Sequence, residues 1–110
     1  MNEQIILTQN NYGVEIQTQF TTNKKVPINI TNCSVEVTFV LPDNTSKHEY
    51  AYMVDAQLGI CGFILEQDHT KNSGLHKTYW SVTDENGFIT AQEEVYYYVK
   101  EAYGGNTVGV

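Results

Sequence analysis

The stretch Ser34-Val-Glu-Val-Thr-Phe-Val-Leu41 decides the fold of this 110-residue chain. An apolar side chain stands at every second position from 35 to 41, with mostly polar side chains between them. Because the side chains of a strand point alternately to its two faces, this period of two predicts a β-strand with one buried face. The Pro-Asp-Asn sequence at 42–44 then predicts a turn, since proline presets φ and both Asp and Asn tolerate the left-handed region.

Similar patterns recur along the chain and predict further strands at 13–20, 47–55, 59–65, 75–83 and 88–102. The segment 47–55 is interpreted as one return strand of a hairpin with 34–41. Polar residues 66–74 predict a connection with room for one helical turn, and the Asp-Glu-Asn-Gly sequence at 84–87 predicts a tight hairpin. From the spacing of about 8–12 residues we expect seven or eight strands in all, and we find no amphipathic helix that could join parallel strands. The pattern predicts an all-β, immunoglobulin-like antiparallel β-sandwich and favours it over a small closed barrel.

Two apolar sheet faces packed against each other would form the core of this sandwich. The residues predicted to fill it are Val35, Val37, Phe39, Phe63, Leu65, Trp80, Val82, Val95, Tyr97 and Val99. We assign residues 1–103 to this single domain, because two halves of the chain would each be too small to bury a core. The Gly-rich residues 104–110 are interpreted as a flexible C-terminal tail or linker.

Composition narrows the classes of function. The formal net charge is −7, and the six basic residues are all lysine. Nucleic-acid binding requires basic side chains that displace counterions, so we expect no nucleic acid as a partner. Attraction to an anionic membrane surface is disfavoured for the same reason, and no apolar run approaches the roughly 20 residues of a spanning helix. We therefore expect no membrane partner either.

The sequence predicts no catalytic residue, no bound metal and no cofactor. His48, His69 and His76 match no zinc-binding spacing and are interpreted as exposed loop histidines. Cys33 and Cys61 are interpreted as reduced, buried side chains that act as small apolar residues. The acidic residues of the predicted turns are explained as turn formers in preference to calcium ligands. The chain also contains no known motif of a hydrolase, a metalloprotease or a phosphate-binding loop.

Eight tyrosines offer the chain a means of binding without catalysis. In the last strand, Tyr97 is expected to join the core, while Tyr96 and Tyr98 face the other side. Together with Tyr50 and Tyr52 they could form an exposed aromatic stripe, which would suit a protein interface or a glycan-binding platform. The structural alternative is that tyrosine has a high strand propensity and pairs well across strands. Both interpretations stay open.

Three segments, in their order along the chain, resemble the N-terminal domain of phage baseplate upper proteins. Pro27–Thr45 resembles the part of that family in which a hydrophobic strand ends in a Pro-Asp-Gly-Thr turn. Asp55–Leu65 is similar to the family's next strand, and Gly74–Gly87 is similar to its hairpin. A closing strand at 95–100 follows, so the resemblance covers about residues 5–101.

The resemblance implies an immunoglobulin-like sandwich at the head of a longer tail or baseplate protein, a virion component that is produced in the bacterial cytoplasm. It implies a structural adaptor without catalytic activity, which docks onto other phage tail or baseplate proteins and serves host attachment. The full-length protein would belong to a homotrimeric assembly.

The resemblance also bears on single residues. Cys33 and Cys61 fall where the family has a small and a valine-like residue, which supports reduced thiols. The chain departs from the family at Asn32 and Asn44, which replace glycine, and at Asn29, which replaces Asp. Because Asn adopts positive φ more readily than most residues, we expect the turns to form nevertheless.

Other classes of function remain as alternatives. The first is a carbohydrate-binding module that uses the exposed tyrosines and Trp80 as stacking surfaces. The second is a bacterial surface, adhesin-like domain with a disulfide between Cys33 and Cys61. An enzyme is the least supported class, because no acid–base constellation is recognisable.

Overall fold

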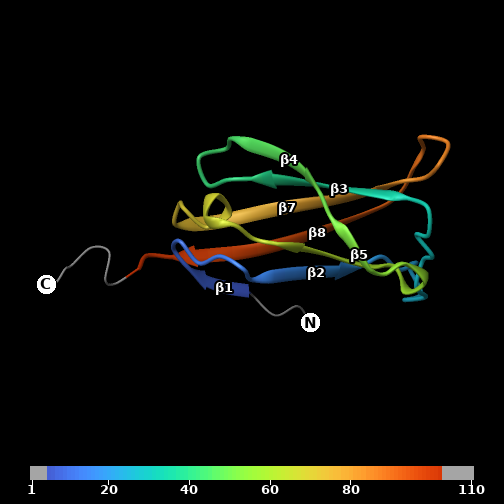
Figure 1. Cartoon of the computed structure of the whole chain (residues 1–110), viewed down its shortest axis with the longest axis horizontal. Coiled ribbons are helices and arrows are strands. Elements are labelled where there is room, and N and C mark those ends of the chain that lie inside the picture. Colours follow the sequence, from blue (N-terminus) through green and yellow to red (C-terminus); the bar gives the residue numbers. More distant parts are fainter. Residues whose placement is uncertain (1–4, 103–110) are drawn as a thin grey trace, which may run out of the picture.

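The computed structural model describes residues 5–102 and has the predicted all-β fold, with eight strands in two sheets (Figure 1). The five-stranded sheet has the order β1-β8-β7-β3-β4, and the three-stranded sheet has the order β2-β6-β5. The strands are β1 (Ile5–Thr8), β2 (Glu15–Gln19), β3 (Ser34–Val40), β4 (Ser46–Tyr50), β5 (Tyr52–Asp55), β6 (Ile60–Ile64), β7 (Gly74–Thr83) and β8 (Ile89–Lys100). Two short 3-10 helices, η1 (Ala56–Leu58) and η2 (Gln67–His69), lie in connections. The predicted linker at 104–110 lies outside the described residues.

Antiparallel pairing holds the sheets together, with one exception. The long strands β7 and β8 form the predicted hairpin, and β3 pairs with both β7 and β4. The exception is β1, which pairs in parallel with β8 in the register Ile5↔Tyr97 to Thr8↔Lys100. Parallel pairing is open to these two strands because the rest of the domain separates them along the chain, so no tight hairpin joins them.

The single return strand predicted at 47–55 is wrong. The chain leaves the large sheet after β4 and enters the small sheet as β5, and Ala51 lies at the crossing. Its N–H donates to the carbonyl of Val35 at 2.9 Å, which is the last tie to the large sheet. Strands that change sheets in this way make the corners of sandwiches. Figure 1 shows the crossing between β4 and β5. In the sequence, the alternating apolar residues Tyr50, Tyr52 and Val54 run through the corner without interruption, so the pattern could not reveal the change of sheet.

The core lies between the two sheets, as the alternation predicted. All predicted core residues are buried except Val95, which is half-buried against the others. The ring of Phe39 in β3 meets that of Phe63 in β6 edge-on, with 5.0 Å between centroids, so the two sheets are in direct contact. The buried apolar residues beyond the predicted set are Ile16, Phe20, Ile30 and Cys61.

Polar atoms inside this core are paired. The indole N–H of Trp80 donates to Thr78 Oγ1 at 2.7 Å, and the Thr78 hydroxyl donates to the carbonyl of Val95 at 2.5 Å. The Tyr97 hydroxyl donates to the carbonyl of His69 at 2.7 Å. Among the described residues, no buried side-chain nitrogen or oxygen lacks a hydrogen-bond partner. The core can therefore hold a tryptophan and a tyrosine without the cost of an unpaired polar group.

The turns form as expected despite the asparagines. Asn32 and Asn44 adopt positive φ values of 65° and 69°, so each takes the conformation for which glycine is the usual choice. Asn29 accepts hydrogen bonds from the backbone N–H and the hydroxyl of Thr31 at 2.9 and 2.6 Å. Its amide oxygen thus does what an Asp carboxylate does in such a turn.

The prediction of exposed loop histidines is wrong for His69 and His76, which are buried, and for His48 it is correct only in exposure, because His48 lies in strand β4. His69 ends η2 and is 2% exposed, and His76 lies on the inner face of β7 with 1% exposed. His76 stacks on the ring of Tyr97 at 4.8 Å between centroids, and its Nε2 lies 2.7 Å from the carbonyl of Asn72. The sequence did contain a signal for the burial of His76. It lies an even number of positions from Trp80 on the same strand, so the two side chains point to the same face.

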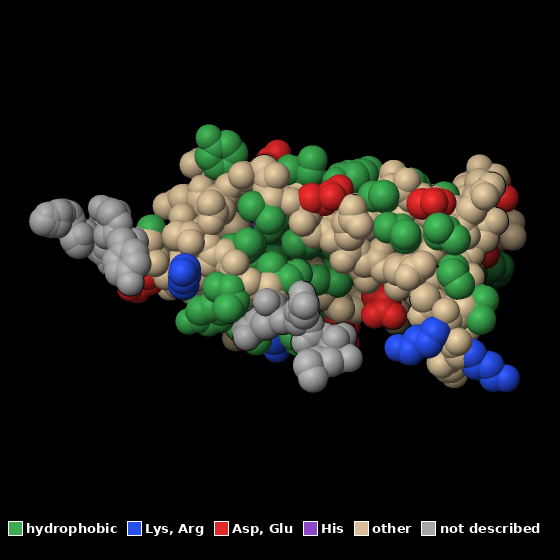
Figure 2. Space-filling view, turned by 90° about the horizontal axis from the view of Figure 1, so that it is seen from below, with side chains coloured by type: hydrophobic (Ala, Val, Ile, Leu, Met, Phe, Trp, Pro, Cys, Tyr) green, Lys and Arg blue, Asp and Glu red, His purple; other side chains and the backbone are tan. Residues whose placement is uncertain are grey.

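Figure 2 looks onto the edge of the sandwich that carries β1 and β2, and hydrophobic side chains gather along the middle of this edge. Ile5 and Leu7 of β1 are half-buried there and pack against the core. Within residues 5–102, no helix has the length and apolar character needed to cross a membrane.

Candidate interaction surface

The structure brings together two of the four tyrosines predicted to form an exposed stripe. Tyr96 and Tyr98 lie on the outer face of the large sheet, two positions apart on β8. Tyr50 is exposed on β4, at the opposite edge of that sheet. Tyr52 belongs to the small sheet, where its hydroxyl donates to the carboxylate of Glu15. This hydrogen bond raises the pKa of Tyr52 to about 12. The four rings therefore form no continuous stripe.

Tyr96 and Tyr98 are part of a larger exposed group, which we call the apolar cluster. The strand register places Tyr98 between Ile6 of β1 and Leu75 of β7, and it places Tyr96 beside Lys77. Tyr79 follows on β7, and it pairs with Glu94 of β8. The members of the cluster and their exposed fractions are Ile6 57%, Leu75 42%, Tyr79 36%, Tyr96 42% and Tyr98 40%. Sequence reasoning missed Ile6, Leu75 and Tyr79 as members of this surface. Leu75 and Tyr79 lie an odd number of positions from the buried Trp80, so the alternation of the strand directs them to the outer face.

A groove of about 730 Å³ continues the outer face beyond the apolar cluster. It is lined by Glu36, Thr38, Tyr79, Trp80, Ser81, Gln92, Glu93 and Glu94. Tyr79 belongs to both the groove and the apolar cluster, so the two features are continuous. The groove is polar, and three of its side chains are carboxylic acids.

Two carboxylates of the groove lie on the outer face without a lysine partner. In the described part of the chain, Glu36 lies 3.4 Å from His48 Nδ1, and no basic side chain lies within ion-pair distance of Glu94. Glu94 instead accepts a hydrogen bond from the Tyr96 hydroxyl at 2.8 Å, which raises the pKa of Tyr96 to about 12. The groove therefore carries negative charge at neutral pH, with Tyr96 as a neutral hydrogen-bond donor at its border.

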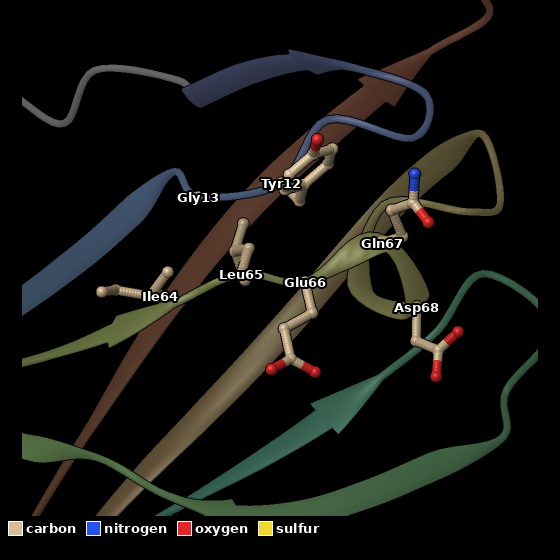
Figure 3. Close-up of a pocket in the computed structure, with 7 residues that line it drawn as sticks. All are labelled: Tyr12, Gly13, Ile64, Leu65, Glu66, Gln67 and Asp68. Atoms are coloured by element: carbon tan, nitrogen blue, oxygen red, sulfur yellow. The ribbon is translucent and has the colours of Figure 1, made fainter.

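A second, shallower pocket of about 540 Å³ lies between the β1–β2 connection and the end of β6. It is lined by Tyr12, Gly13, Ile64, Leu65, Glu66, Gln67 and Asp68. Figure 3 shows the Tyr12 ring above Leu65, with the side chains of Glu66 and Asp68 pointing away from it. The lining contains no histidine, cysteine or lysine, and its titratable side chains are Tyr12, Glu66 and Asp68.

The pair of His69 and Glu49 joins a buried imidazole to a partly exposed carboxylate. The backbone N–H of Glu66 donates to His69 Nδ1 at 2.9 Å, so a neutral ring carries its proton on Nε2. That nitrogen lies 2.5 Å from Glu49 Oε2, to which it donates. The ring packs between Phe39 and Phe63, with centroids 4.5 and 5.1 Å away. Packed against two phenylalanine rings and with both nitrogens engaged, His69 fastens η2 to β4.

Neither the turn carboxylates nor the cysteines add a chemical site. Asp43 accepts from the N–H and the hydroxyl of Thr45, and these bonds lower its pKa. Asp84 accepts from the backbone N–H groups of two residues in the β7–β8 turn. Across residues 5–102, no three His, Cys, Asp or Glu side chains gather as a metal site would require. Cys33 is half-buried, Cys61 is buried, and both are free thiols.

Comparison with known proteins finds a solved structure that has a similar fold. No protein-family profile and no curated protein sequence match the chain. Among solved structures, it is similar to the N-terminal domain of phage TP901-1 ORF48, with a TM-score of 0.69. The match covers 89% of this chain and 85% of the phage domain, at 17% sequence identity. The two domains thus share a fold over nearly their whole length.

Proposed function

We propose that this chain is a non-catalytic structural domain of a phage or prophage tail or baseplate, which docks onto other tail proteins of the host-attachment apparatus. The observation that carries the proposal is the fold that it shares with a phage domain over nearly the full length of both. A resemblance of three sequence segments, in the right order, to baseplate upper proteins supports it independently of the coordinates. In such an apparatus the chain would form part of a trimeric assembly in the virion.

The surface of the domain supports docking over catalysis. The apolar cluster is a large exposed group, and such groups mark interaction sites on soluble domains. Tyrosine contributes strongly to protein interfaces because it buries a large area and keeps a polar hydroxyl. By contrast, Asp43 is engaged in a turn and the pair of His69 and Glu49 in packing, and the exposed groove contains no histidine, cysteine or lysine.

The proposal is tested by the composition of purified particles. Phage particles induced from the genome that encodes the chain would be purified by density gradient and analysed by quantitative mass spectrometry. We expect the chain in a fixed, small number of copies relative to the tail proteins, and we expect particles from a deletion strain to adsorb poorly to the host. Intact, fully adsorbing particles without the chain would refute the proposal.

A carbohydrate-binding module is the second candidate, because Tyr79, Tyr96 and Tyr98 lie on one exposed face. Stacking on sugars requires such exposed rings. A glycan array with the isolated chain separates the two functions. Specific binding that is lost in Tyr98→Ala would favour the module, whereas an empty array together with the chain in particles favours the structural role.

A further inference from the structure

We propose that the outer face of the large sheet is the docking face, and that it binds a partner protein presenting apolar side chains next to lysine or arginine. The inference rests on the proposed function and adds to it the surface and the chemistry of the partner. Two adjoining regions of this face carry the argument: the apolar cluster and the acidic groove.

The apolar cluster is continuous across three strands. Ile6, Tyr98 and Leu75 stand side by side on β1, β8 and β7, and Tyr96 and Tyr79 extend the group along the last two strands. The exposed face of an antiparallel sheet is ordinarily polar, because only the other face packs on the core. Here the outer positions at one end of β7 and β8 are mostly apolar, so water covers a surface that a partner could dehydrate favourably.

The acidic groove, which is the groove lined by Glu36, Glu93 and Glu94, favours a partner with a positive charge. The carboxylates of Glu36 and Glu94 lie in it without a lysine partner among the described residues. An apolar partner would remove water from both carboxylates at a high cost, whereas a lysine or arginine would offset that cost. Tyr79 pairs with Glu94 at the junction of the two regions, so its ring could also stack on a guanidinium group.

Charge also argues against a second copy of this chain as the occupant. Each copy carries a formal net charge of −7, so two copies repel each other while a basic partner is attracted. The lysines of the outer face, Lys77 and Lys100, lie on the side of the apolar cluster and not in the groove. The field of the groove therefore remains negative and directs a cationic group to it.

The experiment measures binding of the full chain to purified tails from particles that lack it. Two variants place a charge in the apolar cluster, Leu75→Asp and Tyr98→Glu, and the double variant Glu36→Lys/Glu94→Lys reverses the charge of the groove. Ile64→Asp on the small sheet and Glu85→Lys in the β7–β8 turn are the matched controls, since both sites are exposed and neither belongs to the apolar cluster or lines the groove. Thermal unfolding of each variant confirms that it is folded.

We expect each cluster variant and the double charge reversal to weaken binding at least about tenfold, and the controls to stay within about twofold of the unmodified chain. Added salt should weaken binding of the unmodified chain more than that of the double charge reversal. If Ile64→Asp weakens binding while Leu75→Asp does not, the docking face is wrong although the proposed function stands. If the unmodified chain binds no tails and is absent from particles, the proposed function itself fails.

Three further outcomes would overturn the inference. Binding that is indifferent to salt and to the double charge reversal would exclude a basic partner. Light scattering that shows a dimer of the unmodified chain and a monomer of Leu75→Asp would make a second copy the occupant. Binding of a defined glycan that Tyr98→Glu abolishes would make the face a carbohydrate platform.

Discussion

At the scale of single residues, the histidines show how burial changes a side chain's role. His69 is covered by two phenylalanine rings, accepts from the backbone through one nitrogen and donates to Glu49 through the other. It thereby fastens η2 to β4. His48, by contrast, is exposed on the edge strand β4. The same residue type therefore has a structural role at position 69, whereas at position 48 we expect it to contribute little to stability.

Replacing His69 with alanine should destabilise the domain by about 2–4 kcal/mol. The variant loses a buried ring and leaves the N–H of Glu66 and the carboxylate of Glu49 without their partner. His48→Ala is the control and should change the free energy of unfolding by no more than about 0.5 kcal/mol, because its site is exposed. Urea unfolding measures both variants, and equal values for the two would contradict the role assigned to His69.

His76 should make the domain less stable as the pH falls. Burial lowers its pKa below the ordinary value of 6.5 that it regains on unfolding. The unfolded chain therefore binds more protons below that pH, so the stability contributed by neutral His76 is complete above about pH 6.5 and declines as the pH falls towards the folded pKa. Urea unfolding at pH 7.5 and 5.5 should show a smaller loss for His76→Gln than for the unmodified chain. An equal or larger loss in the variant would exclude His76 as a source of the pH dependence.

At the scale of elements, some turns and corners need glycine only because the residue has a positive φ. Others need it also because a Cβ would collide with neighbouring atoms. Gly59 follows η1 with a φ of 73°, and Gly87 lies in the β7–β8 turn with a φ of 86°. A Cβ on Gly59 would lie 2.5 Å from the carbonyl oxygen of Ile28 and 2.7 Å from that of Phe20, whereas one on Gly87 would meet nothing within 4 Å. The positive φ disfavours other residues at both positions, but only at Gly59 do backbone atoms also leave no space for a Cβ.

Gly59→Ala should therefore be much more destabilising than Gly87→Ala. The Gly87 variant bears only the cost of an alanine at positive φ, about 1–2 kcal/mol. The Gly59 variant must in addition move two backbone carbonyls, so we expect a loss of at least about 3 kcal/mol or a failure to fold. Circular dichroism and thermal unfolding of the two variants measure the difference. Similar unfolding temperatures would show that the β5–β6 corner is looser than described.

At the scale of the whole molecule, the state of the two cysteines shows whether a covalent bond links the two sheets of the sandwich. Cys33 precedes β3 of the large sheet, and Cys61 lies inside β6 of the small sheet. A disulfide between them would link the two sheets, as the adhesin-like alternative requires. In the structure both thiols are free, and burial raises the pKa of Cys61 to about 12.

Two free thiols are expected per chain when it is unfolded in guanidinium and titrated with a thiol reagent. In the folded protein at pH 8, Cys61 should react far more slowly than Cys33, because the thiolate is the reactive form and a pKa near 12 leaves only about one part in ten thousand ionised. Mass spectrometry of the alkylated peptides identifies the modified cysteine. Zero free thiols after unfolding would restore the disulfide alternative.

The sequence by itself determined whatever depends on neighbouring residues. Alternation gave most of the strands and most of the core, because the side-chain period of a strand is a local property. It did not give β1 or the change of sheet between β4 and β5. Turn residues located the β3–β4 and β7–β8 connections, because positive φ at Asn44 and Gly87 depends on the residue itself. The all-β sandwich and the inward direction of Tyr97 follow from these two local rules.

Only the tertiary structure decided how distant segments meet. The change of sheet at Ala51 separated Tyr52 from the other three tyrosines, and the arrival of β1 beside β8 placed Ile6 next to Tyr98. His69 is buried because η2 packs against strands that lie far from it in the chain. Burial and surface patches result from contacts between remote segments, and a local period of two contains no information about which sheet edge or which loop covers a given face.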